Sequence, residues 1–578
     1  MSEISDVLNA LNLASYITLV IRYLLPLLAV IIVARCAMSL LRGEYEGEEW
    51  GALVLPAGVR VTLAHWENVV GRAKSCDVSL QYPTLSRTHA ALIRDARGDW
   101  RVYDLKSRGG VSVNGKYAER DGMELKSGDK INFGGVDAVF IASEREDESR
   151  IAETRTKPGK LISPTLTLIL VTQFQVLLAV ALSLAASEFA VAAPLALASV
   201  SVAMWFCYAL TRAMRRTAFE VETVAFFLSS IGMAVAASSR PDMLDRQLMF
   251  LAMGVGLYFA VGWFLRDLNR AKKLRWGVAL AGLGLLAVNI VFGGVLFGAK
   301  NWLEIGGVSF QPSEFVKIAF AFAGAATLDR LFARRNLIMF VGYAGACLIA
   351  LALMSDFGTA LVFFVAYLVI AFLRSGDFAT VLLSVAGAGF AGFLAIQVKT
   401  HVASRFASWG HAWEYANTSG GYQQTRTMAA AATGGLFGVG AGNGWLKHIF
   451  AADTDMAFGM MCEELGLIVA LSAVAAIIVL AVFAARSATI GRSAFYVIGA
   501  CATIAMLMTQ TALNALGSMD ILPFTGVTFP FVSRGGSSLV ACWGMLAFVK
   551  ACDTRQNASF TVGLPKRGKR RESEEVDE

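Results

Sequence analysis

The sequence predicts a polytopic α-helical membrane protein with about 13 transmembrane helices and one cytoplasmic all-β sandwich near its N-terminus. Composition is the first reason, because 56% of the 578 residues are hydrophobic and only 16% are charged, unlike an average soluble protein. Apolar stretches long enough to cross a bilayer also recur along most of the chain. Residues 44–143 break this pattern with short alternating runs between Gly, Asp and Asn turns, which are typical of strands.

The N-terminal segment, residues 1–43, is predicted to be a transmembrane anchor. Its apolar run contains Arg22, and the firmer positive flank, Arg35 and Arg42, comes after it. A secretory signal would carry its charge before the apolar run and small residues at a cleavage site after it, and VARCAMS is a poor cleavage site. We therefore expect an uncleaved anchor with its N-terminus outside the cell, the alternative being a cleaved signal peptide.

The alternating runs of residues 44–143 predict a sandwich of about 100 residues, followed by a polar linker at 144–160. Four motifs follow one another at specific spacings: GR at 71–72, LSRTHA at 85–90, DLKSRGGVSVNG at 104–115 and LKSGDKINFG at 125–134. In order and spacing they resemble those of a forkhead-associated (FHA) domain. The resemblance implies a phosphothreonine peptide held on loops at one end of the sandwich.

The FHA resemblance maps the phosphate contacts onto Arg72, Ser86 and Arg87. An arginine and a hydroxyl suit this task, because charge-assisted hydrogen bonds to phosphate are strong and directional. His89 is expected to buttress the loop. One departure concerns the family's usual Asn-Gly-Thr, which is GGV at residues 109–111 and so lacks an amide and a hydroxyl. A docking domain without affinity for phosphopeptides is therefore the alternative.

Residues 161–552 are predicted to form the membrane domain. We expect about twelve spans, at 161–186, 190–211, 219–238, 247–265, 274–297, 313–329, 337–354, 357–373, 379–398, 456–484, 493–514 and 535–551. Lys and Arg gather in the loops on one side of these spans, and the positive-inside rule makes that side cytoplasmic. The rule places the sandwich and the tail, 553–578, in the cytoplasm and the large loop, 399–455, outside. The tail is basic and then acidic, and we expect it to be disordered.

The large outer loop is the most unusual part of the membrane domain. Eight glycines fall between Gly420 and Gly444, and two isolated carboxylates, Asp453 and Asp455, follow. Because long ordered loops tend to be functional, we expect this loop to roof an active site. The candidate substrate or cavity residues on the outer side are Trp302, Gln311, Glu314, Lys317, Asp356, Thr359, Arg405, Tyr422, Gln423, Arg426, Lys447, Ser533 and Arg534.

Two of these candidates, Glu314 and Lys317, lie three residues apart at a helix start and so share one helix face. Such charges at a membrane edge are costly unless they are paired or functional, and a purely structural ion pair is the alternative. The histidines of the outer loop include no i,i+4 pair, so we expect no metal site built from them.

Five motifs occur in one order over about 250 residues: QPSE, SDFGTA, GGYQ followed by GGLFGVGAG, TDMAF followed by EELG, and LPFTGVTFPFVSRGGSS. They resemble those of the SEDS family of cell-wall polymerases, the FtsW, RodA and SpoVE group. The resemblance implies a peptidoglycan glycosyltransferase that polymerises lipid II outside the bacterial plasma membrane, usually with a class B penicillin-binding protein. It maps the family's essential Asp onto Asp455, and its polar cavity residues onto Glu314, Lys317 and Asp356.

The chain departs from the family in four places. Two additional helices, within 161–211, are expected before the common core. The family's usual QPD is MSD in this sequence, and Met456 replaces the Phe that follows the essential Asp. The common FVSYGGSS is FVSRGGSS, so Arg534 adds a positive charge at the outer surface, where it would suit a lipid phosphate. Asp455 itself is retained, which favours an active enzyme.

The expected chemistry needs one base for the acceptor hydroxyl and positive charge for the pyrophosphate leaving group. Asp455 is the candidate base, and a divalent cation, Mg or Mn, could share the task of supplying positive charge to the pyrophosphate. We expect as partners lipid II, the penicillin-binding protein, a phosphothreonine protein and membrane lipids, and no nucleic acid. The alternatives are a lipid II flippase, although the sequence shows no internal repeat, and a non-catalytic scaffold. A role in cell elongation is not distinguished from one in division or sporulation.

Overall fold

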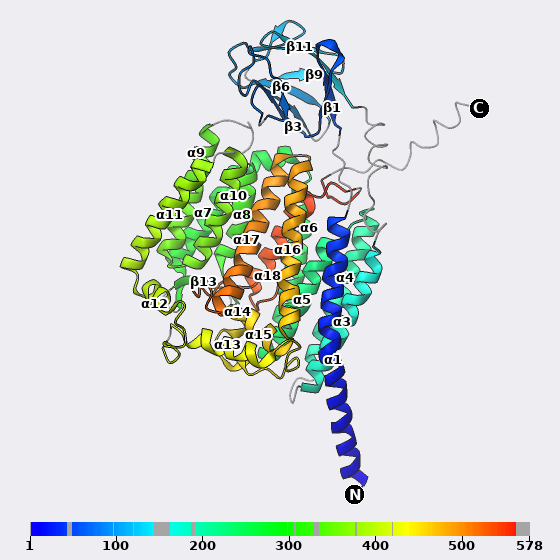
Figure 1. Ribbon diagram of the computed structural model, residues 1–578, viewed down its shortest axis with the longest axis vertical. Coiled ribbons are helices and arrows are strands. Elements are labelled where there is room, and N and C mark those ends of the chain that lie inside the picture. Colours follow the sequence, from blue (N-terminus) through cyan, green and yellow to red (C-terminus); the bar gives the residue numbers. More distant parts are fainter. Residues whose placement is uncertain are drawn as a thin grey trace, which may run out of the picture.

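The computed structural model describes residues 2–42, 49–74, 76–95, 98–119, 121–143, 162–185, 191–296, 299–305, 308–326, 334–375, 378–418, 420–555 and 557–561. They form a helical membrane domain and a β-sandwich, and Figure 1 shows the sandwich at one end of the helix bundle. The predicted fold class, a polytopic α-helical membrane protein with an all-β sandwich, is confirmed. We call the two ends of the bundle the sandwich end and the loop end.

The sandwich consists of two sheets with strand orders β2-β1-β11-β10-β7-β8 and β4-β3-β5-β6-β9. Its strands are β1 (Gly51–Val54), β2 (Arg60–Leu63), β3 (Glu67–Gly71), β4 (Val78–Ser79), β5 (Ala90–Arg94), β6 (Trp100–Asp104), β7 (Val111–Val113), β8 (Lys116–Tyr117), β9 (Met123–Leu125), β10 (Lys130–Phe133) and β11 (Val136–Ala142). Alternate residues point inward, and Leu53, Val102 and Phe140 are fully buried between the sheets.

Thirteen helices of the described chain correspond to the predicted anchor and spans: α1 (Ser2–Leu41), α3 (Pro164–Ala185), α4 (Ala192–Ala213), α5 (Glu220–Ser239), α6 (Leu244–Phe264), α7 (Leu268–Phe292), α8 (Pro312–Ala326), α9 (Arg334–Leu353), α10 (Phe357–Ser375), α11 (Phe378–Val398), α16 (Leu467–Ile490), α17 (Ala494–Ser518) and α18 (Gly536–Ala551). The predicted span 456–484 is wrong at its start, because residues 457–464 form the separate short helix α15 and the chain turns at Gly466, with φ +90°, before α16 begins. In the described part of the chain, nine helices are long and apolar enough to cross a membrane, and three shorter apolar helices accompany them.

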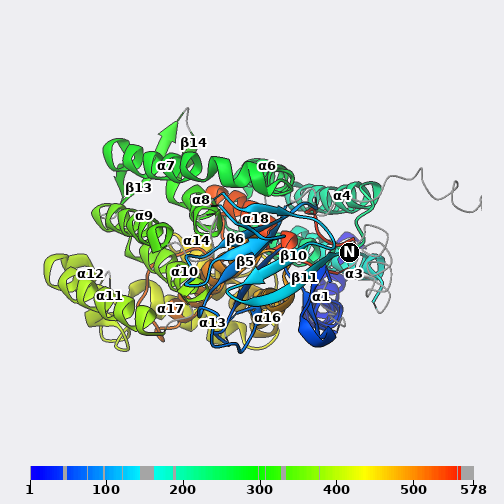
Figure 2. The same cartoon turned by 90° about the horizontal axis from the view of Figure 1, so that it is seen from above.

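The core of the membrane domain is built around α18. Its Trp543 is 1% exposed and lies edge-on to Phe226 of α5, Tyr258 of α6 and Phe531, with ring centroids 4.7, 6.0 and 6.0 Å away. Helices α1, α3 and α4 pack beside this core against α5 and α16, and they lie together at one side of the bundle in both views (Figures 1 and 2). These aromatic contacts hold together segments that are far apart in the sequence.

The loop end carries the short elements (Figure 1): the sheet β12 (Gly294–Leu296), β13 (Ala299–Ile305) and β14 (Val308–Phe310), and the helices α12 (Thr400–Ser408), α13 (Tyr422–Gly434), η3 (Leu446–His448), α14 (Ala452–Asp455) and α15 (Ala457–Glu464). The last two residues of α15 organise the glycine-rich segment. Glu463 accepts hydrogen bonds from the backbone of Trp445 and Leu446 (2.8 and 2.9 Å), and Glu464 accepts one from Gly442 (2.8 Å). The glycine-rich segment is therefore folded tightly onto α15.

Candidate active site

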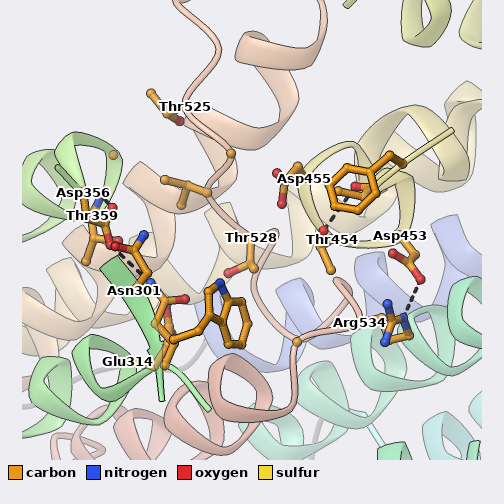
Figure 3. A pocket seen from close by; sticks show the side chains of 18 of the residues that line it. Asn301, Glu314, Asp356, Thr359, Asp453, Thr454, Asp455, Thr525, Thr528 and Arg534 are labelled. Carbon is orange, nitrogen blue, oxygen red and sulfur yellow. Dashed lines mark hydrogen bonds and ion pairs between the residues drawn. The ribbon is translucent and has the colours of Figure 1, made fainter. Parts of the chain in front are cut away.

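A cavity of about 1560 Å³ opens at the loop end of the bundle. Its walls come from the α5–α6 turn, β13, the starts of α8 and α10, α12, α14 and the 522–528 segment. Figure 3 shows Asp356, Thr359 and Glu314 grouped on one side, and Asp455 with its neighbours on the other. The cavity therefore has two polar walls, contributed by segments about 100 residues apart along the chain.

Asp455 ends the short helix α14 and lines the cavity. Burial raises the pKa of its carboxyl to about 7, and the Thr454 hydroxyl and the Arg405 charge hold it below what burial alone would give. Gly526, with φ +70°, lies so close that a Cβ there would be 3.0 Å from Asp455 Oδ2. A carboxylate with a pKa near neutrality is suited to take a proton at physiological pH.

The backbone around Asp455 is held by two buried side chains. Asn514 of α17 donates from Nδ2 to the carbonyls of Asp455 (3.0 Å) and Val527 (2.8 Å), and its Oδ1 accepts from Phe458 N (3.2 Å). The Ser533 hydroxyl donates to the Thr454 carbonyl (2.6 Å). These bonds tie α14 to α17 and to the 527–533 segment, so the position of Asp455 is set by its neighbours.

The second aspartate of the loop, Asp453, is engaged differently. Its buried carboxylate pairs with Arg534 Nε and accepts the Ser239 hydroxyl at 2.8 Å, and Arg534 N donates to the Asp453 carbonyl at 2.8 Å. Asp453 is thus an anchor between the loop, α5 and the start of α18. Arg534 lines the cavity but is committed to this pair.

The opposite wall holds a second polar group. Lys317 Nζ lies 2.7 Å from Glu314 Oε1, and the side chains are 1% and 4% exposed. Glu314 lines the cavity, whereas Lys317 lies behind it. Asp356 accepts from Gln311 Nε2 (3.2 Å) and Thr359 N (3.1 Å), and burial raises its pKa. Trp302, Gln311 and Thr359 also line the cavity, as the sequence predicted for this cluster.

Among the described residues, five lysine and arginine side chains line the cavity. The sequence singled out Arg405, Lys447 and Arg534 but missed Arg240 and Arg246, which flank the α5–α6 turn. The signal was present, because two arginines in a short loop on the predicted outer side break the positive-inside pattern. Arg405 donates to the Thr525 carbonyl (3.3 Å), and Lys447 donates to the Gly442 carbonyl (2.6 Å).

Three other predicted residues, all on α13, do not line the cavity. The Arg426 guanidinium lies 4.6 Å from the centre of the Tyr422 ring, and Gln423 Nε2 donates to the Phe450 carbonyl (3.0 Å). The Gln423 contact supports Phe450, which does line the cavity. Ser533 likewise supports the wall through the Thr454 carbonyl and does not line the cavity itself.

No group of three or more His, Cys, Asp and Glu side chains that could hold a metal ion occurs among the described residues. Mg²⁺ can be held by one or two carboxylates together with substrate phosphates. Glu314 Oε2 is a buried oxygen on the cavity wall without a hydrogen-bond partner, yet Asp356, a carboxylate on the same wall, is already engaged by Gln311 and Thr359. These residues alone do not form a resident metal site.

In the sandwich, the predicted phosphate-binding residues lie on adjoining loops. Arg72 N donates to the Ser86 carbonyl (3.0 Å), and Ser86 Oγ accepts from Arg108 N (3.1 Å). His89 is fully buried; its Nδ1 accepts from Ser86 N (3.1 Å), and its Nε2 lies 3.0 Å from the Gly110 carbonyl, as expected of a buttress. A Cβ at residue 109 would be 2.5 Å from Gly134 Cα, so the GGV departure reflects close packing of this loop.

Comparison with known proteins agrees with both parts of this arrangement. Residues 220–558, more than half of the chain, match the family of cell cycle proteins that comprises FtsW, RodA and SpoVE. The chain belongs to this family. Residues 68–134 match the FHA domain. The family match begins at Glu220, the first residue of α5, so the anchor α1, the sandwich, α3 and α4 precede the shared core.

Relatives and a solved structure are similar to this chain over 54% to 62% of its length. The peptidoglycan glycosyltransferase RodA of Mycobacterium tuberculosis (strain ATCC 25618 / H37Rv) is 29% identical over 333 residues, covering 54% of this chain and 70% of the relative. The probable peptidoglycan glycosyltransferase FtsW of Saccharophagus degradans is 30% identical over 392 residues, covering 62% and 98%. A chain of a solved structure, described as "Structural coordination of polymerization and crosslinking by a peptidoglycan synthase complex", is 24% identical to this chain. The match has a TM-score of 0.49 and covers 57% of this chain and 96% of the solved one.

Proposed function

We propose that this chain is a peptidoglycan glycosyltransferase that polymerises lipid II at the outer face of the bacterial plasma membrane. The observation that carries the proposal is Asp455, a cavity carboxylate with a pKa of about 7, in a cavity that is also lined by cations. The names of the RodA and FtsW relatives support it.

In the proposed reaction, Asp455 accepts the proton of the acceptor sugar's hydroxyl. The freed oxygen attacks the anomeric carbon of the donor, a new glycosidic C–O bond forms, and the bond from that carbon to the lipid pyrophosphate breaks. The electron pair leaves with the pyrophosphate, which needs no strong general acid because it is already a good leaving group. A single displacement of this kind inverts the anomeric configuration.

The cations of the cavity are proposed to bind the pyrophosphate groups. Arg240, Arg246, Arg405 and Lys447 line the same cavity as Asp455 and would supply positive charge where the leaving group develops negative charge. A divalent cation, Mg or Mn, would have to be brought with the pyrophosphate, because the described residues form no site for it alone.

The proposed function also includes an orientation in the membrane and two protein partners. The loop end faces outward, the sandwich end and the C-terminus lie in the cytoplasm, and the N-terminus of α1 is outside, as the distribution of Lys and Arg indicates. A class B penicillin-binding protein would supply crosslinking. The FHA domain would bind a phosphothreonine protein through Arg72, Ser86 and Arg87.

Polymerisation of lipid II by the purified protein tests the proposal. The wild type, Asp455→Asn and Glu414→Gln, a control at an exposed carboxylate of the same loop, are compared with and without the penicillin-binding protein. We expect glycan strands from the wild type and the control, and none from Asp455→Asn. Equal product from Asp455→Asn would refute the base, and no product from any variant under any partner condition would favour a flippase or a scaffold.

A further inference from the structure

The sandwich contacts the membrane domain through the turn between β2 and β3. Trp66 N donates to the Arg492 carbonyl (2.6 Å), and His65 Nδ1 lies 2.7 Å from the Gly491 carbonyl. Glu67, the first residue of β3, accepts from the Ser493 hydroxyl (2.8 Å) and from Ala494 N (3.2 Å). The partners are the turn that joins α16 to α17, residues 491–493, and Ala494, the first residue of α17.

Aromatic rings continue this contact. Trp50 and Trp66 of the sandwich lie edge-on with centroids 5.8 Å apart, and Trp66 lies edge-on to Tyr496 of α17 at 6.2 Å. The Arg94 guanidinium covers the Trp50 ring at 4.5 Å. Trp50, Trp66 and Tyr496 are 7%, 4% and 1% exposed, so the rings form a packed joint between the sandwich and α17.

Glu67 also completes the N-terminus of α17. Ser493 is the N-cap residue, and its hydroxyl accepts from Phe495 N (3.3 Å). The Glu67 carboxylate adds a negative charge and an acceptor for Ala494 N at the positive end of the helix dipole. A residue of the sandwich thus supplies part of the cap of a membrane helix.

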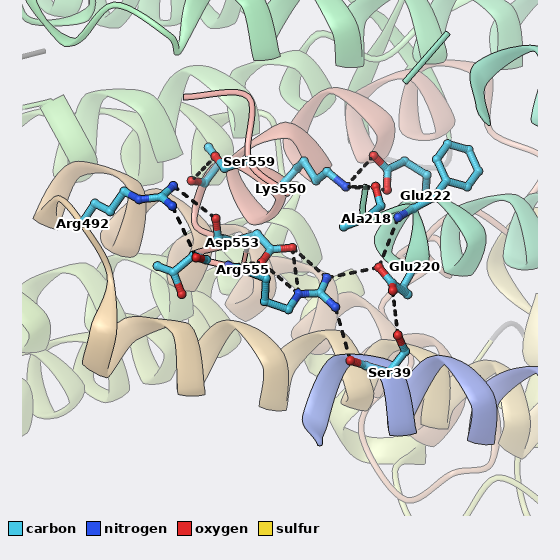
Figure 4. Close-up of polar contacts among 12 residues, drawn as sticks. Ser39, Ala218, Glu220, Glu222, Arg492, Lys550, Asp553, Arg555 and Ser559 are labelled. Atoms are coloured by element: carbon cyan, nitrogen blue, oxygen red, sulfur yellow. Dashed lines mark hydrogen bonds and ion pairs between the residues drawn. The ribbon is translucent and has the colours of Figure 1, made fainter. Parts of the chain in front are cut away.

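The turn that receives the sandwich is itself anchored in a buried ionic network, which Figure 4 shows. Arg492 donates to the carbonyls of Asp553 (3.5 Å) and Thr554 (3.4 Å). Arg555 pairs with Asp553 (2.8 Å) and Glu220 (3.1 Å), and Glu220 accepts the hydroxyl of Ser39 on α1 (2.6 Å). The docking platform is therefore fixed to α1, α5 and the segment after α18, and it is not a free loop. The prediction of a disordered tail from residue 553 is wrong for this segment, since Asp553, Arg555 and Phe560 are buried, and residues 562–578 lie outside the described residues.

The predicted phosphopeptide loops lie at the other end of the sandwich. Strand β3 runs from Glu67, at the joint, to Gly71, and Arg72 follows directly. At about 3.3 Å per residue, Arg72 is about 17 Å from Glu67 along the strand. The antiparallel partner strand β5 is arranged in the same way. Its Arg94 end lies at the joint, and His89, just before its other end, lies near the predicted phosphopeptide loops.

We propose that this joint is a dedicated docking surface that holds the FHA domain on the α16–α17 turn while its phosphothreonine site stays free. The domain then acts as a fixed adaptor, and a phosphothreonine protein is bound at the cytoplasmic face without displacing the sandwich. The inference rests on the proposed phosphothreonine binding, and it does not depend on the glycosyltransferase reaction. Docking and peptide binding are assigned to separate residues, Glu67 and Arg72.

Hydrogen–deuterium exchange of the full chain in lipid nanodiscs tests the docking surface. We expect the amides of residues 490–497 to exchange at least about tenfold faster in Glu67→Ala, because the joint and part of the α17 cap are lost. Arg72→Ala and Glu124→Ala, a control at an exposed strand carboxylate, should leave this protection unchanged. Unchanged protection in Glu67→Ala would overturn the proposal.

Retention of a degenerate phosphothreonine peptide library, with the unphosphorylated library as control, is measured on the same proteins. The wild type and Glu67→Ala should retain the phosphorylated library equally, which also shows that the variant sandwich is folded, and Arg72→Ala should lose retention. Adding the library to the wild type should leave 490–497 protected. If adding the library removes the protection of residues 490–497, or if the wild type does not retain the library, the proposal that the docked domain acts as an adaptor is wrong. Neither readout uses lipid II, so failure of the polymerase proposal is detected separately.

Discussion

Asn514, near the end of α17, donates its side-chain amide to the backbone carbonyl of Asp455 at 3.0 Å. The same amide reaches the Val527 carbonyl at 2.8 Å, on the segment that contains Gly526 beside the Asp455 carboxylate. One buried side chain therefore sets the separation between the proposed base and the segment facing it. Asn514 is a positioning residue, because it touches the backbone of Asp455 and not the cavity.

Replacing Asn514 with Ala should lower the polymerisation rate at saturating lipid II by about tenfold or more, because two buried carbonyls lose their donors. Thr509→Ala is the control on the same helix, since that hydroxyl donates to Ala505 of its own helix. Single-turnover rates of the two variants check the prediction. A full rate in Asn514→Ala would show that α14 is positioned without it.

The rate should rise with pH around neutrality, because the proposed base must be deprotonated and the pKa of Asp455 is raised to about 7. Arg405 lowers this pKa, so Arg405→Gln should move the midpoint of the pH–rate profile upward. A profile whose midpoint does not move in Arg405→Gln would contradict this electrostatic link.

The Asp455 carboxyl should also make the free energy of unfolding depend on pH. Because its folded-state pKa exceeds the ordinary value of 3.8, the folded state binds the proton more tightly than the unfolded state. This contribution to stability is complete below about pH 4 and is lost as the pH rises through about 7. Asp455→Asn should therefore flatten the pH dependence of the unfolding midpoint between these limits, measured by thermal unfolding in detergent.

Breaking the Asp453–Arg534 pair should destabilise the loop end. Arg534→Gln leaves a buried carboxylate without its cation, at a cost of about 3 kcal/mol or more, whereas Asp453→Asn/Arg534→Gln should recover much of it. The unfolding midpoints of the two single variants and the double variant form the required cycle. Additive losses in the double variant would show that the pair contributes no coupling.

The arginines of the α5–α6 turn should act on substrate binding. Arg240→Gln/Arg246→Gln should raise KM for lipid II by about tenfold, since charge-assisted bonds to phosphate are lost, and should weaken the dependence of KM on salt. Arg101→Gln, at an exposed position of β6, is the matched control. An unchanged KM in the double variant would remove these arginines from the substrate site.

Local sequence patterns were sufficient for the elements but not for their contacts. Apolar length located the helices, and alternation located the strands, because both depend on neighbouring residues. The clusters around Glu314 and Asp356 were also predicted, since charges at a membrane edge stand out in an apolar chain. Arg240 and Arg246 were missed although their position in an outer loop was a signal, and their place on the cavity wall became evident only from the folded chain.

Asp453 and Asp455 show most clearly which features local sequence predicts and which depend on folding. Sequence patterns alone predicted a glycine-rich loop with Asp453 and Asp455 between membrane helices, and the family resemblance favoured Asp455 as the base. Folding brings Asp453 against Arg534, 81 residues away, and holds the backbone of Asp455 through Asn514, 59 residues away, although both aspartates line the cavity. Hydrophobicity and periodicity are local properties, whereas the partner of a buried charge is set by folding of distant segments, and that partner distinguishes an anchor from a base.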